Sequence, residues 1–156
     1  MATSQIFDFA AKLAYSDSAS TAPSNVPDWL HGETIFTGSA THRTEFDQDV
    51  DHGDPLSSNI DIPLGQITNV SLLVIKATPY NSTDKLLIKL MLDGSSDYVL
   101  HFGTKTGGQS ALLVFPMAAT GHASDDGCHQ VQITHVILSG AASDAYARIQ
   151  ACVFGD

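Results

Sequence analysis

The segment from Asp47 to Asp54, DQDVDHGD, carries the residue types best suited to hold a metal ion. Its carboxylates belong to Asp47, Asp49, Asp51 and Asp54. Ca²⁺ prefers such oxygen ligands and takes about six to eight of them. An EF-hand loop would have glycine at its sixth position and glutamate at its twelfth, where this chain has His52 and Ser58. Two interpretations stay open: a loop that holds Ca²⁺ loosely, and a solvated acidic loop that discourages strands from pairing edge to edge.

A second group of candidate ligands lies between His122 and His129. It adds two aspartates and Cys128 to the two histidines. Zinc sites place their ligands in two groups, with about two to four residues between the ligands of each group, and this spacing does not fit. We interpret the stretch as a polar loop and predict no cofactor, apart from the Ca²⁺ that residues 47–54 could hold loosely.

The two cysteines are predicted to be free thiols. The apolar runs VQITHVIL and AYARIQACVF near the end of the chain suggest a hairpin with Leu138 opposite Ala145. That register places Cys152 opposite Val131 and about 10 Å along the strand from Cys128, too far for a disulfide.

The sequence contains none of the motifs that mark common enzyme sites. There is no G-x-S-x-G, H-E-x-x-H, Walker or G-x-G-x-x-G sequence, and no pair of strand histidines of the kind that cupins use. Glu33 and Glu45 are the only glutamates, which leaves few candidates for a general acid. The glycine-rich stretch at residues 104–108 links two strands and has no helix behind it to hold phosphate. We predict a protein without enzymatic activity.

The composition is acidic but contains few charged residues. Of 156 residues, 15% are charged, and 7 Lys+Arg against 17 Asp+Glu give a formal net charge of −10. A surface of this sign repels phosphate backbones, so we expect no direct nucleic-acid partner. The sequence begins without a cationic segment, and its apolar runs fall short of the ~20 residues that span a bilayer. We therefore expect no signal peptide and no membrane partner.

Four apolar runs between residues 67 and 115 organise the chain: SLLVIKAT, KLLIKLML, DYVLHFG and ALLVFP. The second and third have apolar residues at every second position, the period of a strand with one buried face. A loop through DGSSD brings these faces together in one register, which pairs Leu92 with Tyr98, Leu90 with Leu100, and Ile88 with Phe102. SLLVIKAT is apolar on both faces, which is typical of a central strand.

Weaker strand signals flank this block. ETIFTG and HRTEF predict two short strands, with Ile35 and Phe46 pointing inward. Residues 59–63 predict a brief edge strand, because Pro63 has no N–H to donate to a central ladder. In VQITHVIL the same alternation places His135 on the inward face with Val131 and Ile133, as a hydrogen-bonded core imidazole.

The first 27 residues predict an arm. Residues 1–15 place apolar side chains at helical spacing, which indicates a short amphipathic helix, and SDSASTAPSNVP then reads as an extended tether. Residues 28–156 would form the sandwich domain. The arm would bind protein through Ile6, Phe7, Phe9 and Leu13. Two placements stay open, on a neighbouring subunit or across an end of its own sandwich.

These elements predict an all-β fold: an antiparallel β-sandwich of jelly-roll or related Greek-key type, with about eight strands and a short N-terminal helical arm. The MATSQIFDFAAKLAY arm followed by the SLLVIKAT to ALLVFP block resembles small β-sandwich proteins of tailed-phage particles, such as capsid-decorating, cement or head-tail components. The resemblance implies a homo-oligomer located in the virion, with arms on neighbouring subunits or on a capsid lattice. If the protein is not viral, we expect it in the cytoplasm.

The alternative is a carbohydrate-binding module, because sandwiches carry sugars on exposed aromatic rings, often beside Ca²⁺. The exposed ring would be Trp29, and the loop from Asp47 to Asp54 would supply the ion site. Three tyrosines are further candidate platforms: Tyr80, Tyr98 and Tyr146. Trp29 has a competing explanation as a plug at the edge of the core.

Overall fold

The computed structural model of the chain describes residues 5–10, 34–93, 95–116, 128–139 and 145–156. Within these residues every regular secondary-structure element is a β-strand. None of the described residues forms a helix with the length and apolar character needed to cross a membrane. The predictions for Leu13, for Trp29, for the tether and for the loop at residues 117–127 lie outside this part of the chain.

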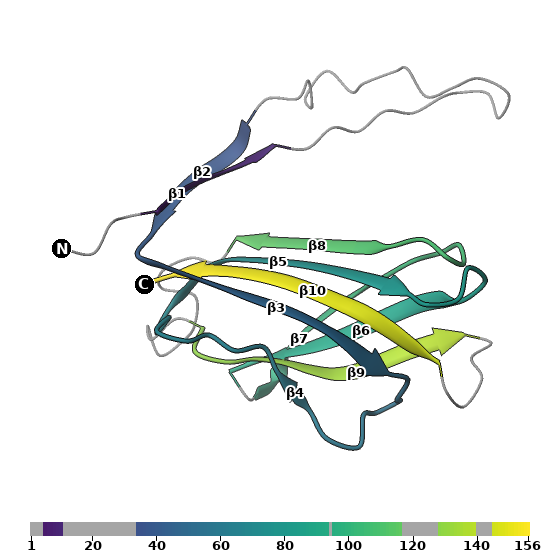
Figure 1. Ribbon diagram of the computed structural model, residues 1–156. Helices are drawn as coiled ribbons and strands as arrows, with labels where there is room; N and C mark the ends of the chain where they lie inside the picture. Colours follow the sequence, from purple (N-terminus) through teal and green to yellow (C-terminus); the bar gives the residue numbers. More distant parts are fainter. Residues whose placement is uncertain (1–4, 11–33, 94, 117–127, 140–144) are drawn as a thin grey trace, which may run out of the picture.

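Two four-stranded antiparallel sheets face each other and form a sandwich (Figure 1). The first sheet has the strand order β3 (His42–Asp51), β10 (Tyr146–Gly155), β5 (Val70–Pro79) and β8 (Ala111–Pro116). The second has the order β4 (Ile60–Asp61), β9 (Val131–Ser139), β6 (Lys85–Leu92) and β7 (Ser95–Gly103). We refer to them as the β10 sheet and the β9 sheet.

The order of the strands is that of a jelly roll. Along the chain, β3 and β4, β5 and β6, β7 and β8, and β9 and β10 each fall in opposite sheets. Except for the hairpin of β6 and β7, neighbours within a sheet therefore come from distant parts of the sequence, as in two interlocked Greek keys. The predicted antiparallel sandwich of about eight strands is confirmed.

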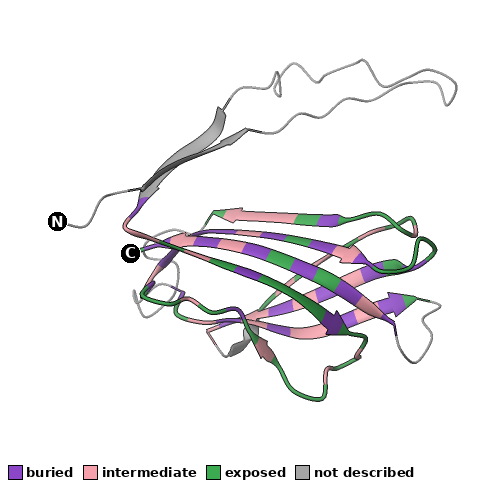
Figure 2. Ribbon diagram, viewed as in Figure 1, coloured by how far each residue is buried: buried purple, intermediate pink, exposed green. Residues whose placement is uncertain are grey.

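The core lies between the two inner faces and follows the period of the strands. In β10 the residues alternate between buried and more exposed positions along its whole length (Figure 2). Strand β5 lies between β10 and β8, as its two apolar faces predicted. The fully buried larger side chains are Val70, Leu73, Ile75, Leu86, Ile88, Leu90, Val131, Ile133, Val136, Ile149 and Val153. Predicted inward, Phe46 is indeed buried, whereas the side chain of Ile35 is not described.

The hairpin of β6 and β7 has the register that the hydrophobic pattern predicted over most of its length. Ile88 pairs with Phe102 and Leu90 pairs with Leu100. Beyond Met91 the register shifts, and Leu92 pairs with Ser95 where Tyr98 was expected. The hairpin end is therefore tighter than a five-residue loop would make it, since β7 already begins at Ser95.

A β-bulge in β9 overturns the prediction for His135. Lys89 pairs with His135 but Leu90 pairs with Ile133, so Thr134 is the extra residue. One extra residue reverses the alternation of faces beyond it. Val136 and Leu138 are accordingly buried, and His135 leaves the core. Its Nδ1 lies 2.9 Å from Thr134 Oγ1 and its Nε2 lies 3.7 Å from an Asp54 carboxylate oxygen.

The predicted N-terminal helix is wrong for residues 5–10, which form strand β1 (Gln5–Ala10). This strand pairs antiparallel with β2 (Thr34–Ala40), and Phe7 opposes Gly38. Both segments are rich in β-branched and aromatic residues, and a helix of about 11 residues is marginal by itself in water. Pairing between segments distant in the chain therefore outweighs the local helical spacing. We call β1 and β2 together the arm ribbon.

The arm ribbon extends away from the sandwich at the point where β3 begins (Figure 1). Its strands pair with each other and, among the described strands, with no third one. At its root, Thr41 donates from its backbone N–H and its Oγ1 to the Asp156 carboxylate, at 2.9 and 3.0 Å. Asp156 is in turn held by backbone hydrogen bonds with Thr68 and Asn69, just before β5. The ribbon thus leaves the sandwich from a fixed point.

Candidate functional site

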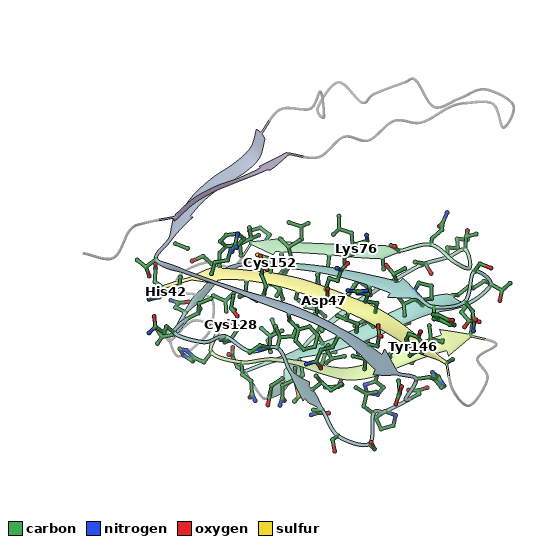
Figure 3. All side chains as sticks on the ribbon, viewed as in Figure 1. His42, Asp47, Lys76, Cys128, Tyr146 and Cys152 are labelled. Atoms are coloured by element: carbon green, nitrogen blue, oxygen red, sulfur yellow. The ribbon has the colours of Figure 1, made fainter. Side chains whose placement is uncertain are left out.

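The outer face of the β10 sheet brings together polar side chains from three strands. Because the strands pair in register, outward residues form rows across the sheet. One row runs from Glu45 through Cys152 to Val74, the next from Asp47 through Gln150 to Lys76, and a third from Asp49 through Arg148 to Thr78. Figure 3 shows Cys152, Asp47 and Tyr146 following one another along this face.

Asp47 organises the centre of the face. Arg148 donates from Nε and Nη2 to the two carboxylate oxygens, each at 2.8 Å, and Gln150 donates to one of them at 3.2 Å. The guanidinium lies diagonally across the ladder, since its direct neighbour in register is Asp49. The Arg148 hydrogen bonds lower the pKa of Asp47 from its ordinary value. This bidentate pair is exposed, so its main consequence is a fixed orientation of Arg148.

Two tyrosines stack at the start of β10, next to this pair. Tyr80 donates its backbone N–H to the Tyr146 carbonyl at 3.1 Å, which makes the two residues cross-strand neighbours. Their ring centroids are 4.5 Å apart with 26° between the planes. Burial raises the pKa of Tyr146, and the neighbouring Tyr80 and Asp49 add to the rise. Tyr80 itself is 68% exposed, an unusual position for a large ring.

Two hollows lie on this face, one on each side of the Asp47–Arg148 pair. The larger, about 400 Å³, is lined by Asp49, Thr78, Pro79, Tyr80, Tyr146 and Arg148. The other, about 350 Å³, includes Glu45, Val74, Lys76, Gln150 and Cys152 in its lining. Together they offer an aromatic platform, carboxylates, a guanidinium, an amide and a hydroxyl. These groups lie on strands except for Tyr80, which directly follows β5. Such a set binds polar ligands by stacking and hydrogen bonding.

The predicted cation loop is a strand over most of its length. Asp47, Asp49 and Asp51 lie on β3, where a period of two directs them all outward. Asp54 lies past the strand, near His135 of the β9 sheet. Among the described residues, no three His, Cys, Asp or Glu side chains gather as a metal site would require. The alternation that suggested a set of ligands instead spreads the carboxylates along a strand.

Both thiols are free, as predicted. The hairpin on which that prediction was based is wrong, because β9 and β10 belong to opposite sheets. Cys128 is buried and donates to the Gln130 carbonyl at 3.4 Å. Burial raises the pKa of the Cys128 thiol to about 12, and the Asp93 carboxylate adds to the rise. Asp93 also accepts the backbone N–H of His129, so it ties the turn after β6 to the segment before β9.

Cys128 is expected to resist thiol reagents in the folded protein. Burial holds its pKa at about 12 against an ordinary 9.0, so near neutral pH its thiolate fraction falls on the order of 1,000-fold below that of the unfolded chain. Titration with a chromogenic disulfide should show Cys152 reacting first, and Cys128 only when denaturant is added. Equal rates for Cys128 in native and denatured protein would contradict the expectation, and a Cys152→Ser variant isolates the signal.

The raised pKa of Cys128 also makes the free energy of unfolding depend on pH. Below pH 9 both states carry the Cys128 proton, so this group leaves the free energy of unfolding unchanged there. Between pH 9 and about 12 the folded state holds the proton more tightly, so stability declines as pH rises. In a Cys128→Ala variant, the free energy of unfolding measured by chemical denaturation should decline less steeply with pH over this range.

The glycine-rich stretch between β7 and β8 is a packing device. Gly108 has a φ of 72°, and a Cβ at this position would lie 2.3 Å from the Ser82 carbonyl oxygen. Its backbone N–H donates to the Asp84 carbonyl at 2.9 Å. The loop thus closes against the β5–β6 connection. This close backbone approach is by itself a reason for glycine at position 108.

The sequence-based predictions found part of this face. Tyr80 and Tyr146 come together, whereas the backbone of Tyr98 lies on β7 in the other sheet. The sequence-based predictions did not single out Arg148, Gln150 or Lys76, which also lie on this face. A signal was present, because the alternating acids of residues 47–51 and the alternating polar residues of β10 are complementary as strand neighbours.

Comparison with protein-family models, with curated protein sequences and with solved structures gave no significant match.

Proposed function

We propose that this is a non-enzymatic assembly protein that attaches to neighbouring protein subunits through the arm ribbon. The observation that carries the proposal is the arm ribbon itself, which stands away from the sandwich on a fixed root (Figure 1). An isolated two-stranded ribbon is at best marginally stable in water. It gains stability when an outer edge or face meets another protein surface, which makes the ribbon a docking element.

Strand addition is the natural mode of attachment. Each ribbon strand pairs with its partner on one side, and no other described strand pairs with its outer edge, which therefore has backbone N–H and C=O groups to offer. Pairing with a sheet edge of a neighbour satisfies these groups and supplies affinity through main-chain hydrogen bonds. In the sandwich, β8 and β7 are edge strands of the two sheets and offer such partners in a second copy.

A jelly roll with a projecting arm suits a particle component. Viral capsid domains are among the proteins that use this fold, although fold alone does not assign function. We propose a homo-oligomer in a virion, of the capsid-decorating or cement kind. Each arm would add buried area across the joints of a lattice, and repeated weak contacts would sum through avidity. The low content of charged residues fits a surface covered by protein.

The root of the arm provides a mild test. Asp156→Ala removes the acceptor for both Thr41 donors but keeps the backbone bonds of residue 156. We expect self-association to weaken several-fold, because a loosened arm loses more entropy on docking. Sedimentation over a range of concentrations measures the change.

Asp156→Asn keeps an oxygen at the same position and serves as the control. The two variants should have closely similar melting temperatures. Equal association of Asp156→Ala, Asp156→Asn and the unchanged protein would argue against a positioned arm. A monomer at all concentrations, with no affinity for particles, would refute the proposed function.

A further inference from the structure

We propose that the outer face of the β10 sheet binds a short neutral oligosaccharide that lies along β10, with Tyr80 as its stacking platform. This activity goes beyond assembly and does not depend on the arm ribbon. It would add recognition of a glycan surface to a protein that attaches to other subunits.

Tyr80 is the anchor of the proposed site. One side of its ring stacks on Tyr146 at a centroid distance of 4.5 Å, yet the residue is 68% exposed. The stack and the backbone hydrogen bond to Tyr146 hold the ring in place before any ligand arrives. An aromatic ring presented in this way offers an apolar surface to the C–H face of a sugar.

The polar groups beside the ring match the hydroxyls of a sugar. Arg148 donates from Nε and Nη2 to the Asp47 carboxylate. This pairing directs the guanidinium along the sheet and leaves Nη1 outside the ion pair. Asp49 adds an acceptor, and Thr78 adds a hydroxyl that already bonds with Ser110 at 2.7 Å. Sugar hydroxyls both donate and accept, so alternating donors and acceptors suit them. The groups lie on strands, which keeps their spacing rigid.

Charge and shape select the class of ligand. The two hollows contain the carboxylates of Glu45, Asp47 and Asp49 against the cations of Lys76 and Arg148. This near balance, on a chain with a net charge of −10, disfavours a polyanion and suits a neutral ligand. From Tyr146 to Cys152 the face extends ~20 Å along β10, so it accommodates a chain of several sugar units.

An array of neutral gluco-, manno-, galacto- and xylo-oligosaccharides tests the proposal with the full-length protein, and calorimetry measures the affinity of each glycan that binds. Tyr80→Ala should weaken binding at least about fivefold, because the stacking surface is lost. Tyr80→Phe should retain most of the affinity. Leu112→Ala is the matched control, since Leu112 is exposed on the same sheet but lines neither hollow.

Cys152 gives a second readout that does not rely on Tyr80 variants. It lines the hollow beyond Arg148, so a bound chain should slow its alkylation by a maleimide. A blank array would overturn the proposal, as would binding restricted to sulfated or uronic-acid glycans. Affinity that survives Tyr80→Ala, or a glycan that leaves Cys152 alkylation unchanged, would place the ligand elsewhere and overturn it too.

Discussion

Removal of residues 1–33 is expected to abolish self-association and leave the sandwich folded. The truncation deletes β1 and leaves β2 without its partner, whereas the core of the sandwich is built from β3 to β10. Loss of a docking element of this kind should weaken association at least about 100-fold, or roughly 2.7 kcal/mol. Sedimentation equilibrium measures the association, and far-ultraviolet circular dichroism checks that the strands persist.

Removal of residues 1–4 is the matched control, because it shortens the same terminus but keeps β1 complete. This shorter truncation should associate like the full chain. The assembly role would be untenable if the two truncations behaved alike. It would also fail if removal of residues 1–33 unfolded the sandwich, since the arm would then be part of the domain and not an attachment.

Leu90→Ala is expected to cause the largest loss of stability among single substitutions. The Leu90 side chain is 0% exposed and lies in the middle of β6, between Leu100 of β7 and Ile133 of β9. Truncation to alanine removes its burial and opens a cavity that neighbours on rigid strands cannot fill. The expected cost is about 2–5 kcal/mol, out of the ~5–15 kcal/mol that stabilises a typical domain. Chemical denaturation measures this loss, provided that the free energy of unfolding falls with denaturant concentration at the same slope in the variant and the unchanged protein.

Leu112→Ala provides the comparison for the same change of side chain. Leu112 is 60% exposed on edge strand β8, so its truncation should alter the free energy of unfolding by less than about 0.5 kcal/mol. The melting temperature of Leu90→Ala should fall by about 5–15 °C, and that of Leu112→Ala by a degree or two. Similar losses in the two variants would contradict the assignment of the core.

Local patterns carried most of the information on strands. A period of two identified the buried faces of β6 and β7, and it selected the register that joins Leu90 to Leu100. The two apolar faces of β5 predicted its place between two other strands. These inferences succeeded because alternation is a property of the strand itself and of its immediate hairpin partner.

Where local patterns failed, the cause was a contact distant in sequence or a single irregular residue. The extra residue Thr134 reversed the faces of β9 and moved His135 out of the core, although no composition signal marks such a bulge. Residues 5–10 have helical spacing, yet they form a strand because residues 34–40 pair with them. Isolated helical propensity is too weak to oppose a complete ladder of backbone hydrogen bonds.

The candidate site depends on contacts between residues that are distant in the sequence. The sequence by itself determined the all-β class, the apolar faces and the acidic alternation of residues 47–51. Only the tertiary structure decided that β3, β10 and β5 share a sheet, which sets Arg148 on Asp47 and Tyr80 on Tyr146. The reason is that β10 makes its ladders with β3 and β5, which are far from it in the chain, and the choice of partner depends on packing of the whole core.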